Sequence, residues 1–173
     1  VFARTYELLD PTVAIQFLAE EGQRIQKGDR LAEISGPARS ILTGERVALN
    51  FLQRLSAIAT KTAWAVDQIQ GSKASIADTR KTTPGLRVLE KYAVRTGGGS
   101  NHRFNLADGI LIKDNHIQAA GGITAAVTQA RKQATHTLKI EVEVENLAMV
   151  DEALACGADI IMLDNMDKAA IEA

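Results

Sequence analysis

The sequence predicts an α/β chain, because short apolar runs and helical patterns alternate through its second half. The expected strands lie near 74–78, 109–113, 138–144 and 159–163. The expected helices cover 84–94, 122–132 and 146–156, and a further one opens near 167. Such alternation implies a parallel sheet that forms part of an α/β barrel, although too few strands are present to close one.

The composition is that of an ordinary soluble chain. Of its 173 residues, 46% are hydrophobic and 4% aromatic, which is enough apolar material for a core. The single cysteine, Cys156, excludes an internal disulfide and fits a reducing compartment, so we expect a cytoplasmic protein. No apolar run approaches the roughly 18 residues of a membrane span, no signal peptide is visible, and a net charge of −1 argues against a general nucleic-acid binder.

Residues 1–43 predict a small β-rich piece. Thr12 to Ala19 is rich in strand formers, Leu31 to Ile34 alternates apolar and polar residues, and Gly22 and Gly28 supply turns between them. The pattern resembles the hammerhead strands of biotinyl and lipoyl carrier domains. A carrier needs a modifiable lysine at a hairpin tip, but Lys27 precedes Gly-Asp as in a structural turn. We therefore interpret the segment as a scaffold, the remnant of a small α+β domain.

A long helix is expected next, within residues 44–72. Glu45 to Gln70 contains no Pro or Gly and would span roughly 39 Å. Its buried face is expected to comprise Val47, Leu49, Leu52, Leu55, Ile58, Ala59, Thr62, Val66 and Ile69. Trp64 is expected to pack rather than to serve as a stacking platform. Arg46 would lie in the first turn, where a cation opposes the helix dipole, so helix stability does not account for it.

The stretch from Asp78 to His116 carries seven Lys or Arg residues against four acids. Arg87, Glu90 and Lys91 are interpreted as a solvated helix face. The remaining basic groups of interest sit at strand ends and in Gly-rich turns: Arg80, Lys81, His102, Arg103 and Lys113. Ligand sites in βα units usually lie where a strand ends and its helix begins. Positive charge gathered from separate loops suits a small, multiply anionic ligand.

The Gly97-Gly98-Gly99 run fits neither a nucleotide-hydrolase phosphate loop nor a dinucleotide fingerprint. We interpret it as a flexible turn that delivers His102 and Arg103. The three histidines lack zinc-ligand spacing, and Cys156 lies in a predicted helix, so a zinc site is not expected.

Two acids in the second half are candidate site residues. Glu141 and Glu143 share one face of a strand, where paired acids would be unfavourable without cations, metal or sugar hydroxyls. Asp164 follows the apolar strand Ile160 to Leu163, at its carboxyl end, whereas Asp159 begins that strand and is interpreted as structural. We favour Glu143 and Asp164 as site residues; for Asp164 alone, a solvated acid at the rim is an equal alternative.

Several motifs, in one order along nearly the whole chain, carry a family resemblance. The longest is Asp78-Thr79-Arg80-Lys81-Thr82-Thr83-Pro84-Gly85-Leu86-Arg87. The others are Gly44-Glu45-Arg46 with Leu49-Asn50, Lys91-Tyr92-Ala93-Val94, Gly97-Gly98-Gly99, Asn101-His102-Arg103, Leu111 to His116, Glu141 to Asn146 and Asp159 to Asn165. Together they resemble the quinolinate phosphoribosyltransferases, the carboxylating nicotinate-nucleotide pyrophosphorylases among the type II phosphoribosyltransferases.

The resemblance implies an open-sided, six-stranded α/β barrel and members longer than this chain at both ends. The chain, which starts at Val1 and stops just inside a helical pattern, is therefore expected to be a fragment. Three parts are expected: residues 1–43 from an N-terminal α+β domain, 44–72 as a connecting helix, and 73–173 as the first part of a barrel. The C-terminal strands and their phosphate-binding loops would be missing.

The implied reaction joins quinolinate to phosphoribosyl pyrophosphate and gives nicotinate mononucleotide, pyrophosphate and carbon dioxide in NAD biosynthesis. By position, the pyridine dicarboxylate would be held by Arg80, His102 and Arg103, with Thr79 beside them. Arg46 would reach this site from the neighbouring subunit of a homodimer.

Four residues would carry the catalytic roles that the resemblance implies. Lys81 and Lys113 would contact substrate or pyrophosphate. Glu143 and Asp164 would bind ribose hydroxyls, or a Mg²⁺ ion that accompanies phosphoribosyl pyrophosphate, and would favour an oxocarbenium-like transition state. Neither a nucleic acid nor a membrane is expected as a partner.

Two alternatives remain open. A related type II phosphoribosyltransferase acting on another ring acid, or a paralogue linked to molybdenum transport, could share this scaffold. The chain could also be a non-catalytic barrel fragment. His102 and Arg103 beside Arg80 favour a dicarboxylate substrate.

Overall fold

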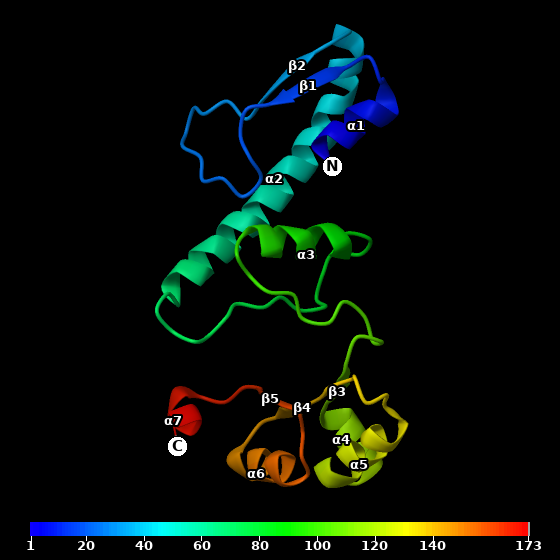
Figure 1. Cartoon of the computed structure of the whole chain (residues 1–173), viewed down its shortest axis with the longest axis vertical. Helices are drawn as coiled ribbons and strands as arrows, with labels where there is room; N and C mark the ends of the chain where they lie inside the picture. Colours follow the sequence, from blue (N-terminus) through cyan, green and yellow to red (C-terminus); the bar gives the residue numbers. More distant parts are fainter. Residues whose placement is uncertain (173) are drawn as a thin grey trace. The chain divides into compact units, whose positions relative to one another are not determined.

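The structure is a computed structural model that describes residues 1–172. The chain divides into two compact units, Val1–His102 and Arg103–Ala173. The first unit contains α1 (Phe2–Leu9), β1 (Ala14–Phe17), β2 (Ala32–Ser35), α2 (Ala38–Gln68) and α3 (Arg87–Thr96) (Figure 1). The second contains β3 (Ile110–Ile112), α4 (Asp114–Ala120), α5 (Ile123–Gln133), β4 (Ile140–Val144), α6 (Leu147–Ala155), β5 (Ile160–Leu163) and α7 (Lys168–Glu172).

Both strands predicted in the β-rich piece at the N-terminus are present, and they form an antiparallel pair that follows helix α1. β1 pairs with β2 from Ala14↔Ser35 to Phe17↔Ala32. In the loop between them, Gln26 N donates to Asp29 Oδ2 and Asp29 N donates to Gln26 O. Lys27 therefore lies in a turn closed at both ends by hydrogen bonds, as expected for a scaffold.

The long helix α2 begins at Ala38, so the predicted start at residue 44 is wrong. Gly44 lies inside this helix, at the contact with α1. A glycine is needed there because a Cβ would come within 2.7 Å of the Tyr6 ring of α1. Tyr6 is buried in the core that α1 and α2 share with Val13 and Ala48.

Three side chains on α2 differ from what the sequence predicts. Arg46 lies in the third turn rather than the first, so the expected conflict with the helix dipole is absent. Trp64 is 62% exposed and Val47 is 50% exposed, so the prediction that these two side chains are packed is wrong.

Close packing of α3 on α2 depends on the glycine run. A Cβ on Gly97 would lie 2.4 Å from Ala59 O, and one on Gly99 would lie 2.8 Å from Thr62 Cγ2. Gly98 has a φ of 87°, which favours glycine. The run is therefore a closely packed turn, and the expectation of a flexible one is wrong.

The strand predicted near 74–78 does not form a sheet within the described residues. Only Ala77 makes an isolated parallel bridge, with Ser100, and Ala74, Ser75 and Ala77 are exposed. Asp78 N donates to Ser100 O and Ser100 N donates to Ile76 O, which holds the two extended segments side by side.

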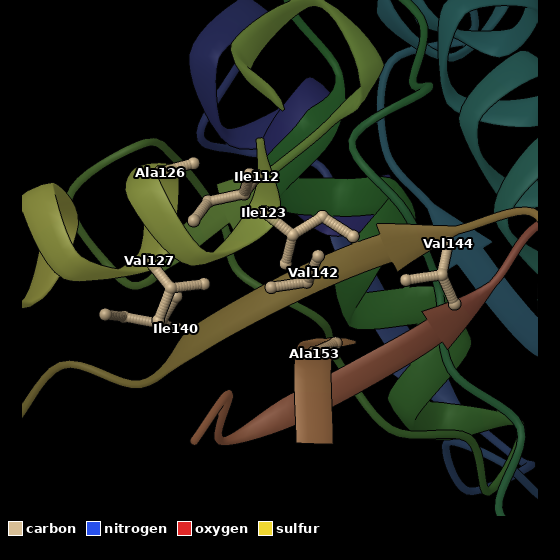
Figure 2. Packing of buried hydrophobic residues seen from close by; sticks show 8 residues of the cluster. All are labelled: Ile112, Ile123, Ala126, Val127, Ile140, Val142, Val144 and Ala153. Atoms are coloured by element: carbon tan, nitrogen blue, oxygen red, sulfur yellow. The ribbon is translucent and has the colours of Figure 1, made fainter. Parts of the chain in front are cut away.

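The second unit has a parallel sheet in the order β3-β4-β5, which confirms the predicted α/β class. Its core consists of Ile112, Ile123, Ala126, Val127, Ile140, Val142, Val144 and Ala153. Figure 2 shows Val127 of α5 beside Ile140 of β4, and Ile123 of α5 beside Val142 of β4. The central strand β4 supplies Ile140, Val142 and Val144, each fully buried.

Helix α4 is an element that the sequence analysis did not predict. It fills the interval between β3 and α5, and it ends at Gly121, which has a φ of 87°. The predicted cap of α6 is confirmed, since Asn146 Oδ1 accepts from Met149 N at 3.0 Å. No helix within residues 1–172 is long and apolar enough to span a membrane.

Candidate active site

In the first unit, the loop from Asp78 to Thr83 carries the predicted residues Thr79, Arg80 and Lys81. The first turn of α3 holds this loop. Arg87 donates from Nε to Thr82 Oγ1 at 3.1 Å and from Nη2 to Arg80 O at 3.4 Å. The backbone around Arg80 is therefore fixed by a side chain that was expected to face solvent.

Arg80 presents a free donor. Its Nε is buried, and it has no hydrogen-bond partner among the residues that the structure describes. A buried, unsatisfied guanidinium N–H is unfavourable by about 1–3 kcal/mol or more, so its presence points to an anion that accepts from it. This property suits a residue that binds a carboxylate.

Thr79 and Lys81 are both exposed. Thr79 Oγ1 accepts from Lys81 N at 3.0 Å, which closes a short turn at this point. The Lys81 ammonium is thus carried on an ordered backbone with its charge in solvent.

The face of α3 that carries Glu90 and Lys91 is buried, which overturns the prediction of a solvated face. Glu90 is 8% and Lys91 is 4% exposed. Glu90 Oε1 accepts from Arg54 of α2 and Oε2 accepts from Thr83 N at 3.1 Å. Burial would raise the Glu90 pKa, but the hydrogen bonds from Arg54 and Thr83 outweigh it and hold that pKa below its ordinary value.

Lys91 forms the second buried ion pair of this helix, with Asp78. The sequence predicts no ion pair between them, and it predicts that Lys91 lies on a solvated helix face. In the sequence, Asp78 and Lys91 belong to two separate motifs, Asp-Thr-Arg-Lys and Lys-Tyr-Ala-Val. Only the fold brings the two side chains together.

His102 closes the first unit, and its backbone is held on both sides. Asp78 Oδ1 accepts from His102 N at 2.9 Å, and Lys91 Nζ donates to His102 O at 2.9 Å. Within this unit the structure therefore brings the backbone of His102 beside the start of the loop that carries Arg80.

In the second unit, Lys113, Glu143 and Asp164 come together at the carboxyl ends of β3, β4 and β5. Lys113 Nζ lies 2.8 Å from Glu143 Oε2. The hydrogen bond with Glu143, aided by the charges of Glu143, Asp164 and Asp114, raises the Lys113 pKa although burial opposes it. Asp164 directly follows the last residue of β5, and its N–H still donates to Val144 O of β4.

Two further residues of this unit position the site. Arg103 Nη1 donates to Gly109 O at 2.9 Å, at the entry to β3. His116 Nδ1 accepts from Lys113 N at 3.0 Å, so this imidazole caps α4 directly behind Lys113.

The opposite end of the sheet confirms the structural reading of Asp159. Its Oδ2 accepts from Ile140 N at 2.8 Å and from Arg131 Nη1 at 2.7 Å. These bonds, the one from Ile140 first, hold the Asp159 pKa below its ordinary value. Glu141, the other acid on the face of Glu143, is 7% exposed and lies within the sheet.

Family models match the chain along almost its whole length. Residues 58–173 match the C-terminal domain of quinolinate phosphoribosyl transferase, and residues 2–56 match its N-terminal domain. The chain belongs to the quinolinate phosphoribosyltransferase family.

Curated relatives within this family carry matching names. A protein of Bacillus subtilis named as a probable nicotinate-nucleotide pyrophosphorylase (carboxylating) is 54% identical over 92% of this chain and 55% of its own length. The nicotinate-nucleotide pyrophosphorylase (carboxylating) of Homo sapiens is 45% identical over 87% of this chain and 52% of its own length. The chain thus spans about half the length of the curated relatives it matches.

Solved structures of the family are similar to this fold. NadC from Streptococcus pyogenes is 53% identical with a TM-score of 0.93, over 99% of this chain and 61% of that one. The nicotinate-nucleotide pyrophosphorylase from Francisella tularensis is 46% identical with a TM-score of 0.95, over the same shares.

Arg46, the family residue expected to serve a neighbouring subunit, is exposed on α2. Exposed apolar side chains lie close to it in sequence on the same helix, Leu42 at 69% and Val47 at 50%. Within residues 1–172, no cluster of three or more His, Cys, Asp or Glu residues that could hold a metal ion occurs.

Proposed function

We propose that the protein catalyses phosphoribosyl transfer from phosphoribosyl pyrophosphate to quinolinate with loss of carbon dioxide, giving nicotinate mononucleotide and pyrophosphate for NAD biosynthesis. Membership of the quinolinate phosphoribosyltransferase family supports the reaction. The observation that carries the proposal is the buried Nε–H of Arg80, which lacks a partner in the described chain and suits a carboxylate of the substrate.

In the first unit, Arg80 and His102 would bind the pyridine dicarboxylate and Thr79 would lie beside it. Lys81, exposed on an ordered turn, would contact the substrate or pyrophosphate as a point charge. Arg103, the first residue of the second unit, would add a planar guanidinium that can bind a carboxylate in bidentate fashion.

In the second unit, Lys113, Glu143 and Asp164 would act on the ribose and its leaving group. The two carboxylates would stabilise positive charge that develops at C1 of the sugar in an oxocarbenium-like transition state. Lys113 is cationic at neutral pH, as lysines ordinarily are, and Glu143 raises its pKa further, so its ammonium group can accompany the departing pyrophosphate.

The chemistry itself needs no covalent nucleophile from the protein. The pyridine nitrogen bonds to C1 of the ribose as the bond from C1 to pyrophosphate breaks. The 2-carboxylate then leaves as carbon dioxide, the cationic ring stabilises the electron pair that stays on C2, and C2 takes up a proton. The protein would supply positioning and charge placement.

Magnesium would enter with the phosphoribosyl pyrophosphate rather than bind to a preformed cage. Two carboxylates, Glu143 and Asp164, beside a lysine fit an ion that keeps several waters and substrate phosphates as ligands. The ion would neutralise the charge of the pyrophosphate group.

We also propose the family architecture for the complete protein. An open-sided barrel would begin at residue 73, the N-terminal α+β piece at 1–43 and the connecting segment at 44–72 would precede it, and later strands would complete it. A homodimer would place exposed Arg46 in the neighbouring subunit's site, and the single cysteine fits a cytoplasmic enzyme.

Replacing Arg80 by alanine tests the proposal. We expect the Michaelis constant for quinolinate to rise at least tenfold or turnover to be lost, because a carboxylate loses its guanidinium partner. Steady-state kinetics on the complete protein measure this, with Arg95→Ala as the matched control, since Arg95 is exposed in the last turn of α3. Wild-type kinetics in Arg80→Ala would remove Arg80 from the site.

A further inference from the structure

Lys91 and Asp78 form a buried ion pair that has no part in the reaction as proposed. Lys91 Nζ contacts Asp78 Oδ1, and the two side chains are 4% and 8% exposed. Removing two charges from water is unfavourable by several kcal/mol per ion unless good geometry and added hydrogen bonds compensate. The other hydrogen bonds that Asp78 and Lys91 make therefore indicate the role of the pair.

Both members of the pair bind the backbone of the same residue. Asp78 Oδ1 accepts from His102 N and Lys91 Nζ donates to His102 O, each at 2.9 Å. Asn101 Nδ2 completes the set by donating to Asp78 Oδ2 at 2.9 Å and to Lys91 O at 3.2 Å. The pair thus fixes the peptide groups on both sides of the His102 Cα.

The pair also connects His102 to the loop that carries Arg80. Asp78 lies two residues before Arg80 in the sequence, and its N–H donates to Ser100 O at 3.1 Å. Lys91 reaches the same point from the middle of α3, whose Arg87 holds Arg80 O. The spacing between the backbones of Arg80 and His102 is therefore set by Asp78 and Lys91.

We propose that Asp78 and Lys91 are positioning residues that act through His102 on the binding of the dicarboxylate. The inference rests on the proposed function, in which Arg80 and His102 both contact quinolinate. An apolar pair of similar volume could fill the same space, but it would leave the N–H and C=O of His102 unsatisfied. The ion pair satisfies both groups and holds the residue in one place.

A double-mutant cycle on quinolinate affinity tests this role. Lys91→Met, His102→Ala and the double variant are titrated by calorimetry in the complete protein. We expect each single variant to bind quinolinate about tenfold or more weakly, and the double variant to bind within about twofold of His102→Ala. If Lys91 acts through His102, replacing Lys91 in a protein that already lacks the His102 imidazole should not weaken quinolinate binding further.

Hydrogen exchange at the His102 amide gives a second readout that needs no ligand. We expect faster exchange in Lys91→Met and in Asp78→Asn. Asp67→Asn is the matched control, because it breaks the ion pair with Arg24 in the same unit and should leave His102 unchanged. If Lys91→Met does not fold, Asp78→Asn replaces it in the cycle, since it preserves side-chain shape and removes only the charge.

The outcomes separate the inference from the function on which it rests. Three results would each overturn the positioning role and leave the proposed reaction standing. These are wild-type affinity in Lys91→Met, additive losses in the double variant, and unchanged hydrogen exchange at the His102 amide. A wild-type protein that does not bind quinolinate would overturn the proposed function, and the positioning role in dicarboxylate binding with it.

Discussion

Lys113 and Glu143 form an ion pair in the second unit, and the hydrogen bond between them raises the pKa of Lys113. Because the pKa of Lys113 is raised, its ammonium persists to a higher pH than that of an ordinary lysine. Stability from this pair is present below the unfolded pKa and is lost as pH rises through the folded pKa. The raised pKa therefore extends the cationic range of Lys113 on its alkaline side.

Replacing Glu143 by glutamine should lower the Lys113 pKa toward its ordinary value, because the amide has no charge to offer the ammonium. A pH titration followed by the ¹³Cε chemical shift of Lys113 measures the change. Glu145→Gln, at an exposed position just beyond β4, is the control and should leave that pKa unchanged. An unaltered Lys113 titration in Glu143→Gln would show that the ion pair does not form in solution.

The juxtaposition of the candidate site residues at the ends of strands could be predicted from the sequence, whereas the burial of Lys91 and Asp78 could not. Lys113 and Asp164 follow apolar runs, and Glu143 lies near the end of a strand, and the carboxyl ends of these three strands meet at one edge of a parallel sheet. Lys91 instead lies on a helix face that looks polar, and its partner Asp78 is 13 residues away. Burial of that face depends on α2 packing against it, which no local pattern indicates.

At the scale of elements, glycines decide how helices approach α2. The run without Gly or Pro from Glu45 to Gln70 predicts a helix that begins near Gly44, since glycine is unfavourable in helix interiors. The place of Gly44 is explained by the Tyr6 ring, which occupies the space of a side chain. Gly97 and Gly99 have the same function at the contact with α3. The helical pattern predicted that α2 exists, but its start and its partners required the packing.

Gly97→Ala should destabilise the first unit by about 1–3 kcal/mol, because its Cβ would lie 2.4 Å from Ala59 O and α3 would have to move. Urea unfolding measures the loss as a lower midpoint with an unchanged slope. Gly109→Ala is the control, since its nearest neighbour would lie at 3.9 Å. Equal stability of Gly97→Ala and the unchanged protein would mean that the helices are less closely packed than described.

At the scale of the whole molecule, each unit has its own hydrophobic core and its own set of functional groups. The α/β class and the parallel sheet could be predicted from the alternation of elements. The strand near 74–78 was predicted from its apolar residues, yet within the described chain it pairs only through Ala77. A short apolar run forms a sheet strand only when a neighbouring strand is available, and sequence periodicity does not reveal the neighbour.

The stability of the molecule in acid should depend on Asp159. Its pKa is held low by Ile140 N–H and then by Arg131, so its contribution is present above the unfolded pKa and is lost as pH falls through the folded one. Asp159→Asn should therefore be less stable than the parent chain at pH 7, with the difference shrinking below about pH 4. Free energies of unfolding at several pH values measure this, with exposed Asp151→Asn as control. A difference that is constant with pH would contradict it.

Calorimetric titration of the complete protein with quinolinate and with nicotinate tests the central claim most directly. The two ligands differ by one carboxylate, the group that an array of Arg80, His102 and Arg103 would recognise. We expect quinolinate to bind at least tenfold more tightly than nicotinate, and Arg80→Ala to remove most of that preference. Equal affinity for the two acids, or no binding of quinolinate, would contradict the account.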